Sequence, residues 1–184
     1  MTTVPLRNSR RPFRNSALWL WSSWLHHDPT TNSGSTTVTM LFVYRADGTL
    51  AGASPALLGR TRGDHSVAGV GERTQSGRLR PGDDTTPAGR FETEPGRNNA
   101  GESIVWIDYA AALAIHRLRP GPGMSDRAHR LATPGPHDNR ASAGCVVVPA
   151  EFYATVVQPL LGQSRGVVYV MPEQAPTDNR SLLR

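Results

Sequence analysis

The chain has one cysteine, Cys145, which follows the small residues Ala143 and Gly144 and precedes a run of valines. A thiol is a competent nucleophile only as a thiolate, so a catalytic cysteine needs an imidazole, a positive charge or converging backbone amides beside it. His116, which lies 29 positions earlier, is the candidate base. This combination of residue types points to acyl transfer through a covalent thioester, with Cys145 as the nucleophile.

The residues that flank the cysteine are expected to supply the rest of such a site. Because Ala143 and Gly144 carry little or no side chain, their N–H groups and that of Cys145 are expected to form an oxyanion hole. Arg140 and Ser142 are expected to contribute positive charge and hydrogen bonds close to the sulfur.

A purely structural interpretation of the same residues remains open. An isolated cysteine before a valine run is more often a small buried hydrophobe than a nucleophile, and many chains contain a cysteine and a distant histidine. A single cysteine excludes an intrachain disulfide, and no cluster of Cys and His has the spacing of a structural zinc site. We expect neither a metal nor an organic cofactor.

The elements that must position these residues are mostly short strands. The chain contains 18 glycines and 15 prolines, which favours a mainly β fold over a helical bundle. His116 falls at the end of one expected strand, and Cys145 directly precedes another. We expect strands at 37–44, 49–53 (after an Asp47-Gly48 turn), from residue 90, and at 103–106, 112–116, 146–148 and 166–171, with helices at 125–132 and 149–161, the latter broken or ended by Pro159.

A long connection from Arg119 to Asn139 lies between the two candidate catalytic residues. It contains several prolines and glycines and one segment of helical composition, for which Ser125 is the expected N-cap. A long insertion beside a reactive centre is a natural lid, so we expect this connection to cover the substrate site.

Several segments, in the same order, resemble the catalytic domain of L,D-transpeptidases (the YkuD-like family). The resemblance covers about Met40 to Glu173, nearly three quarters of the chain. It is carried by TTPAGRF at 85–91, Ile115-His116-Arg117, DNRASAGCVVVP at 138–149, Phe152-Tyr153 and GVVYVMPE at 166–173. The family's fold implies a mainly β barrel or sandwich with one or two short helices.

The resemblance also implies a role for each matching residue. Cys145 matches the nucleophile, His116 the general base, Gly144 the glycine before the nucleophile and Ser142 the serine that opens the motif. The family's third element is commonly a backbone carbonyl just after the base, and this position falls to Arg117.

The implied reaction is acyl transfer on the stem peptides of peptidoglycan. Cys145 would attack the carbonyl of the third residue of a stem tetrapeptide and expel the terminal D-alanine. An amine of a second stem would then resolve the thioester, or water would do so in an L,D-carboxypeptidase. The expected location is the cell envelope or periplasm, because peptidoglycan lies outside the cytoplasmic membrane.

Two positions depart from the family pattern. The family often has His where this chain has Ala143, and commonly has Asn or Arg where this chain has Val147. Both differences remove polar groups from beside the nucleophile, so activity is expected to be reduced or absent. The alternative hypothesis is therefore a catalytically silent cell-wall-binding module of the same fold.

The ends of the chain differ in composition from its middle. Residues 1–36 are expected to be a leader, either disordered or a poor export signal, although Ser9-Arg10-Arg11-Pro12-Phe13 resembles a twin-arginine signal. Residues 37–174 are expected to form one catalytic domain, and 175–184 a flexible tail. No run approaches the apolar length of about 18 residues that a membrane span requires.

The charge of the chain is consistent with an anionic polymer as partner. The net charge is +5, yet all 20 basic residues are arginines scattered along the chain. The only tight cluster, formed by Arg7, Arg10, Arg11 and Arg14, lies in the expected leader, so a nucleic-acid partner is not favoured. A positive surface equally favours an acidic cell wall. We expect peptidoglycan stem peptides as partners, no nucleic acid, and a monomer.

Overall fold

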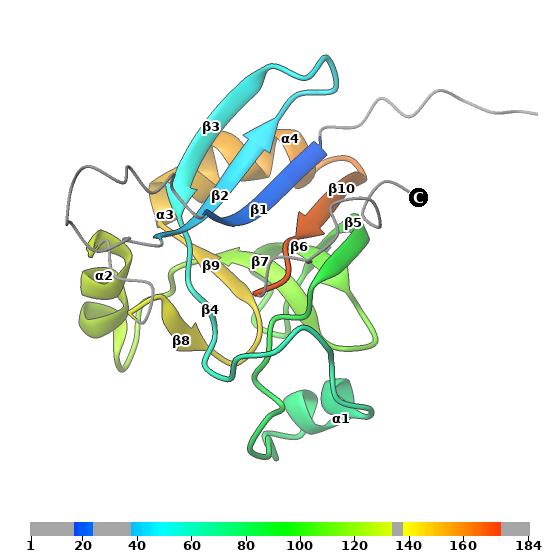
Figure 1. Ribbon diagram of the computed structural model, residues 1–184, viewed down its shortest axis with the longest axis vertical. Coiled ribbons are helices and arrows are strands. Elements are labelled where there is room, and N and C mark those ends of the chain that lie inside the picture. The colour runs from blue at the N-terminus through cyan, green and yellow to red at the C-terminus, as the bar shows by residue number, and fades with distance from the viewer. Residues whose placement is uncertain (1–16, 24–37, 134–137, 174–184) are drawn as a thin grey trace, which may run out of the picture.

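The computed structural model describes residues 17–23, 38–133 and 138–173, and these residues form a mainly β fold (Figure 1). Eight strands form one sheet in the order β3-β2-β1-β10-β5-β6-β7-β9, and a small second sheet pairs β4 with β8. The strands are β1 (Ala17–Ser23), β2 (Val38–Tyr44), β3 (Leu50–Pro55), β4 (Leu58–Gly59), β5 (Gly89–Arg97), β6 (Ser103–Asp108), β7 (Leu113–Arg117), β8 (Arg140–Ser142), β9 (Val146–Val148) and β10 (Gly166–Val170).

Most neighbours in the large sheet are antiparallel, and two pairs are parallel: β1 with β10, and β7 with β9. The β2–β3 hairpin closes at the predicted turn, where Gly48 adopts a φ of 84° and the Thr49 N–H donates to Asp47 Oδ1. Glycine is suited to that turn because it adopts positive φ without a Cβ clash. The mainly β class and the strand positions expected from the sequence are therefore confirmed.

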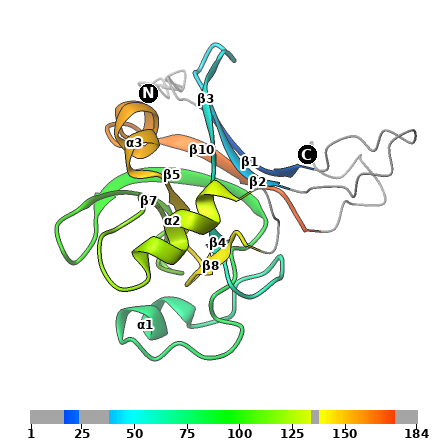
Figure 2. The same cartoon turned by 90° about the vertical axis from the view of Figure 1, so that its left-hand side faces the viewer.

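The helical segment after β9 packs against one face of the sheet, as Figures 1 and 2 show. It comprises α3 (Ala150–Phe152), a π-helical turn (Tyr153–Val157) and α4 (Gln158–Leu161). The core contains Tyr153, Val157 and Leu161 from this segment together with inward-facing strand residues: Leu41, Val43, Val105, Ile107, Leu113, Ile115, Val146, Val148, Val168 and Val170.

Of the two outcomes expected at Pro159, a break or an end of the helix, the structure shows a break in the regular α-helix and no end at Pro159. The helix continues to Leu161, and a π-helical turn lies immediately before α4. Proline has no N–H to donate, and its ring clashes with the carbonyl four residues earlier in a regular α-helix. A widened π turn relieves that clash and keeps Val157 and Leu161 directed into the core.

The strand β1 corrects the expected domain boundary. The sequence predicts a leader outside the domain for residues 1–36, but Ala17–Ser23 pairs in parallel with β10 and antiparallel with β2 inside the large sheet. Without this strand, β2 and β10 would each present unpaired backbone groups at a sheet edge. The remaining residues of the expected leader, 1–16 and 24–36, and the expected tail at 175–184 lie outside the described residues.

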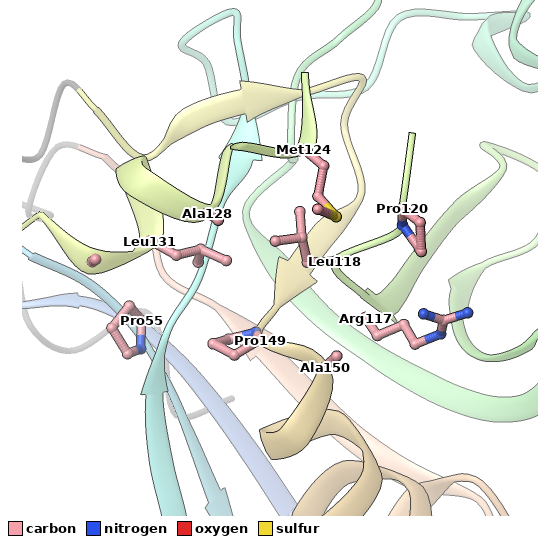
Figure 3. Close-up of a pocket in the computed structure, with 10 residues that line it drawn as sticks. Pro55, Arg117, Leu118, Pro120, Met124, Ala128, Leu131, Pro149 and Ala150 are labelled. Atoms are coloured by element: carbon pink, nitrogen blue, oxygen red, sulfur yellow. The ribbon is translucent and has the colours of Figure 1, made fainter. Parts of the chain in front are cut away.

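The helix α2 (Met124–Ala132) lies in the connection between β7 and β8. Its N-cap is Gly123, with a φ of 73°, and not Ser125 as the sequence predicts. The helix covers an apolar groove of about 530 Å³, shown in Figure 3. The groove is lined by Pro55, Arg117, Leu118, Pro120, Met124, Ala128, Leu131, Ala132, Pro149 and Ala150.

The remaining helix, α1 (Val70–Gln75), is six residues long. It is fixed to the following loop by Arg73, whose Nε and Nη2 each lie 2.6 Å from a carboxylate oxygen of the buried Asp83. The Arg73 guanidinium holds the pKa of that carboxyl down at about 2. Within the described residues, no helix is long and apolar enough to cross a bilayer.

Candidate active site

The alternation of side chains along β6 and β7 separates the core from a cleft. Leu113 and Ile115 of β7 point into the core, whereas Ala114 and His116 line the cleft on the opposite face. The neighbouring strand β6 behaves in the same way, and its Trp106 is paired in register with Ala114. The period of two along a strand therefore directs the His116 imidazole into the cleft.

Parallel pairing of β9 with β7 brings the cysteine to the same cleft. Ile115 is in register with Val146, so Cys145, directly before β9, lies next to Ala114 and close to His116. The cleft has a volume of about 430 Å³. Its described lining residues are Thr74, Gln75, Arg97, Asn98, Asn99, Ala100, Ile104, Trp106, Tyr109, Ala112, Ala114, His116, Arg119 and Cys145. The structure thus unites the two residues that the sequence singled out.

The His116 ring is held in one tautomer by the backbone. Its Nδ1 lies 2.8 Å from the carbonyl oxygen of Arg117. A carbonyl only accepts hydrogen bonds, so Nδ1 carries the proton and the Nε2 lone pair is left available to accept one. Burial lowers the pKa of His116 to about 4, and the positive charge of Arg119 acts in the same direction. His116 is therefore a neutral imidazole at pH 7.

The Cys145 thiol is partly buried in the cleft wall. Its Sγ lies 3.6 Å from the carbonyl oxygen of Ala112, to which the thiol donates. Burial raises the pKa of Cys145, while the Ala114 N–H and the charge of Arg119 oppose the rise. Among the described residues, no hydrogen bond joins the thiol to the His116 imidazole, so the resting pair is a neutral thiol beside a neutral base.

The loop that carries the cysteine is fixed by hydrogen bonds from Ser142. The Ser142 hydroxyl donates to the Cys145 carbonyl at 2.5 Å and accepts from the Gly144 N–H at 3.1 Å. The Gly144 N–H is therefore already used, which corrects its expected place in an oxyanion hole. Among the described residues, the N–H groups of Ala143 and Cys145 have no acceptor, and these two remain as candidate oxyanion donors.

Thr86, which the sequence did not identify as a site residue, holds the same loop by hydrogen bonds. Its hydroxyl donates to the Gly144 carbonyl at 2.6 Å and accepts from the Gly59 N–H at 2.8 Å. Gly144 has a φ of 110°, and a Cβ there would lie 3.1 Å from the Thr85 carbonyl oxygen. The TTPAGRF segment therefore supports the cysteine loop.

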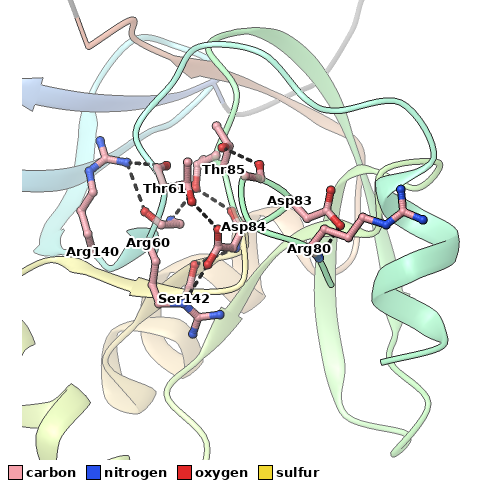
Figure 4. Close-up of polar contacts among 12 residues, drawn as sticks. Arg60, Thr61, Arg80, Asp83, Asp84, Thr85, Arg140 and Ser142 are labelled. Atoms are coloured by element: carbon pink, nitrogen blue, oxygen red, sulfur yellow. Dashed lines mark hydrogen bonds and ion pairs between the residues drawn. The ribbon is translucent and has the colours of Figure 1, made fainter. Parts of the chain in front are cut away.

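The Arg140 side chain makes its contacts with Gly59, Thr61 and Glu173, contrary to expectation; Figure 4 shows it beside Thr61. Its Nη1 donates to the carbonyl oxygens of Gly59 at 3.1 Å and Thr61 at 3.4 Å, and Nη2 forms an ion pair with Glu173. These contacts join β8 to the loop after β4 and to the residues after β10. Arg140 is thus a structural residue, and it is not among the residues that line the cleft.

Two arginines after His116 meet at one carboxylate. Arg117 Nη2 lies 2.6 Å from Glu102 Oε1, and Arg119 Nε lies 2.8 Å from Glu102 Oε2. Asn98 Nδ2 also donates to Glu102 at 2.8 Å, and together these groups hold the Glu102 pKa below its ordinary range. Arg117 therefore contributes its carbonyl to His116 and its side chain to Glu102. Arg119, which lines the cleft, was not identified from the sequence as a site residue.

Ala143 and Val147, the two positions at which the sequence differs from the pattern it resembles, lie in different surroundings. Ala143 is exposed, beside the cleft loop. Val147 is 2% exposed and packs in an apolar cluster with Leu57 and Leu131. An asparagine or arginine at 147 would bury a polar group among these aliphatic side chains, so valine fits the packing under α2.

The helix α2 does not cover the cysteine. None of its residues lines the cleft, and its apolar face instead lies over the groove. The connection between β7 and β8 therefore does not form the expected lid within the described residues. Residues 134–137 of that connection lie outside them.

The arrangement is suited to general-base activation of a thiol. A neutral imidazole with a free Nε2 accepts a proton from a thiol that attacks a bound carbonyl, and two backbone N–H groups lie on the cysteine loop to receive the oxyanion. No group of three or more His, Cys, Asp or Glu side chains suited to holding a metal ion occurs among the described residues.

Comparison of the chain with protein-family models, with curated proteins and with solved structures gives no match.

Proposed function

We propose that this protein is a cysteine acyltransferase that acts on the stem peptides of peptidoglycan, as an L,D-transpeptidase or L,D-carboxypeptidase in the cell envelope. One observation carries the proposal. Cys145 and His116 face one open cleft from adjacent parallel strands, and the Arg117 carbonyl holds the His116 tautomer that has Nε2 free. A sulfur nucleophile, an oriented base and room for a ligand are the minimum that acyl transfer requires.

The first chemical step forms the thioester. His116 Nε2 accepts the thiol proton as Sγ bonds to the carbonyl carbon of the third stem residue, and the oxyanion is received by the Ala143 and Cys145 N–H groups. The tetrahedral intermediate then collapses, the bond to the terminal D-alanine nitrogen breaks, and the imidazolium gives its proton to that nitrogen. An amine of a second stem, or water, next attacks the thioester with His116 again as base, which restores the thiol.

The resting protonation states favour a concerted step over a preformed thiolate. The pKa of His116 is about 4 and that of Cys145 is raised, so proton transfer before attack is unfavourable at pH 7. The thiol also donates to the Ala112 carbonyl in the resting state. A rotation about the Cys145 Cα–Cβ bond must therefore bring Sγ from Ala112 toward His116 as substrate binds, because catalytic hydrogen bonds often tighten only in the complex.

A catalytically silent wall-binding module of the same fold is the second candidate. The raised pKa of Cys145 and the apolar surroundings of Val147 favour it, since a buried thiol is inert and a polar neighbour is missing. In this case the cleft would hold a stem peptide without cleaving it. The two candidates differ in one observable, the formation of a covalent bond at Cys145.

Mass spectrometry after incubation with a carbapenem separates these candidates, because the resemblance implies that such drugs acylate the nucleophile. We expect the wild-type protein to gain the mass of the drug at Cys145, and Cys145→Ala to gain none. The same samples incubated with a stem tetrapeptide should release D-alanine only with wild type. Wild-type protein that binds intact peptidoglycan but forms no adduct and releases no D-alanine would establish the silent module instead.

A further inference from the structure

The cleft beside Cys145 has an excess of positive charge on its walls. Arg97 and Arg119 both line it, and none of its described lining residues is acidic. Glu102 does not line the cleft, and its one carboxylate is shared between Arg117 and Arg119. An anion that enters therefore meets cations and no like charge among the described lining residues, which favours an anionic ligand.

Arg119 has hydrogen-bonding capacity that the protein does not use. Its Nε lies 2.8 Å from Glu102 Oε2, but the N–H is not aligned with that oxygen and has no hydrogen-bond acceptor among the described residues. The side chain is 36% exposed, so its outer nitrogens are accessible from the cleft. A guanidinium has five donors and binds a carboxylate through two parallel hydrogen bonds. A bound carboxylate would satisfy donors that the protein leaves free.

The other arginines near the cysteine are already engaged. Arg117 is bonded to Glu102 at 2.6 Å, Arg97 Nη1 donates to the Gly101 carbonyl at 2.5 Å, and Arg140 is bonded to the Gly59 carbonyl and paired with Glu173. The charge of Arg119 lowers the pKa of both Cys145 and His116. Arg119 is therefore the arginine whose charge acts on both Cys145 and His116. A substrate bound close to the sulfur lies in the same cleft as this charge.

We propose that Arg119 selects an anionic acyl donor by binding a carboxylate of the substrate peptide beside the carbonyl that Cys145 attacks. Arg97, at the exposed edge of the cleft, adds to the attraction of that anion. The identity of the donor, a stem peptide with a free C-terminal or side-chain carboxylate, rests on the proposed function. The anion site itself does not, and it is testable without any substrate.

Two alkylating reagents of similar size test the anion site directly. Iodoacetate is an anion and iodoacetamide is neutral, and both alkylate the only thiol of the chain, Cys145. The ratio of their second-order rate constants reports the local potential, because a change in the thiolate fraction affects both reagents equally and cancels. We expect Arg119→Gln to lower the iodoacetate-to-iodoacetamide ratio roughly fivefold at low ionic strength, and salt to reduce that difference.

Arg90→Gln is the matched control, because Arg90 is an exposed arginine on β5, the strand whose other end is Arg97. This variant should leave the ratio unchanged. Glu102→Gln provides an effect of the opposite sign, since it removes the carboxylate that partly neutralises Arg119, and it should raise the ratio. An unchanged ratio in folded Arg119→Gln would overturn the proposal. If Arg119→Gln does not fold, a ratio in Glu102→Gln that fails to rise would overturn it.

Stem tetrapeptides that are amidated at one carboxylate at a time then identify the group that is bound. Wild type should release D-alanine more slowly from the peptide that lacks the recognised carboxylate, and Arg119→Gln should lose that preference, mainly through KM. If wild type cleaves no stem peptide but the alkylation ratio falls as expected, the proposed function fails and the anion site stands. If wild type cleaves the peptides and Arg119→Gln keeps both the ratio and the preference, the anion site fails alone.

Discussion

Two hollows lie beside the end of β7, and they differ in kind. The groove under α2 is the larger, at about 530 Å³, and is lined mostly by aliphatic side chains and prolines (Figure 3). The cleft at Cys145 is smaller, at about 430 Å³, and is lined by His116, two arginines and several amides. Volume alone would favour the groove as the candidate active site, whereas titratable side chains with perturbed pKa values favour the cleft.

The chain after His116 contributes alternately to both hollows. Arg117, Leu118 and Pro120 line the groove, while His116 and Arg119 line the cleft. Leu131 and Val147 form an apolar cluster with Leu57 on the groove side, and this cluster supports β9 just after the cysteine. The groove therefore belongs to the packing that holds the site, and the cleft to the proposed chemistry. Substitutions in the two hollows should then have separable effects.

The largest expected effect comes from His116→Ala in the cleft. Loss of a general base typically reduces a rate by about 10²- to 10⁴-fold, so acylation of Cys145 by a carbapenem should fall by that factor at pH 7. Acylation is followed by mass spectrometry, and the fold by circular dichroism. Acylation at the wild-type rate would show that another group activates the thiol.

Leu131→Ala is the matched substitution on the groove side. Leu131 is 6% exposed, and its truncation should lower the free energy of unfolding by about 2 kcal/mol while the acylation rate stays within about twofold of wild type. If Leu131→Ala slowed acylation as strongly as His116→Ala at a temperature where both are folded, the separation of packing from chemistry would be wrong.

The second effect is a pH dependence of the free energy of unfolding, and it arises from the buried His116 in the cleft. Between pH 6.5 and about 4 the unfolded chain binds a proton at His116 that the folded chain does not, because burial lowers the folded pKa to about 4. Stability must therefore rise with pH across this window, and it should be about 3 kcal/mol lower at pH 4 than at pH 7 from this group alone. Urea unfolding at several pH values measures it.

His116→Ala should flatten this dependence, whereas Leu131→Ala should lower stability equally at every pH in the window. The ion pair of Asp83 with Arg73 contributes at lower pH, because the Asp83 pKa is held at about 2: its stabilisation is complete above the ordinary value of 3.8 and is lost as the pH falls toward 2. A slope between pH 4 and 6.5 that persists in His116→Ala would assign it to other groups.

The smallest effect should come from removing the Thr86 hydrogen bonds that hold the cysteine loop to β4. Thr86→Val keeps the shape of the side chain but leaves the buried Gly144 carbonyl and Gly59 N–H without their partner. We expect a loss of about 1 to 2 kcal/mol in stability and, because the nucleophile is less firmly placed, roughly tenfold slower acylation.

Thr93→Val is the control for that substitution. Thr93 is 1% exposed and its hydroxyl accepts from the Gly166 N–H at 2.9 Å, away from the cleft. It should cost similar stability with no change in the acylation rate. Equal rates in the two variants would remove Thr86 from the support of the cysteine.

Local patterns were enough to predict several features. The β-branched runs and the Asp47-Gly48 turn predicted most of the strands, and the apolar run at 112–116 predicted that His116 falls near a strand end. The resemblance to L,D-transpeptidases implies the Arg117 carbonyl as the partner of the imidazole, and the hydrogen bond at 2.8 Å is present. These features depend on neighbours in the chain, which a sequence records directly.

Other features were missed because they depend on partners far away in the chain. The contacts of Arg140 with Gly59 and Glu173 fix the direction of its side chain. The Gly144 N–H is occupied because the Ser142 side chain places its hydroxyl oxygen within hydrogen-bond distance. The strand β1 joins the sheet because it pairs with β2 on one side and with β10 on the other. The composition of residues 17–23 does not reveal these two partners.

The sequence by itself determined which residue types were available: one thiol, a histidine at a strand end and small residues before the cysteine. The tertiary structure decided that β9 lies parallel to β7, and so that the thiol and the imidazole share a cleft with Arg119. It also decided that the thiol and the imidazole are both neutral at rest, because burial by distant elements sets their pKa values. Strand pairing and burial are cooperative properties of the whole fold, so no single segment specifies them.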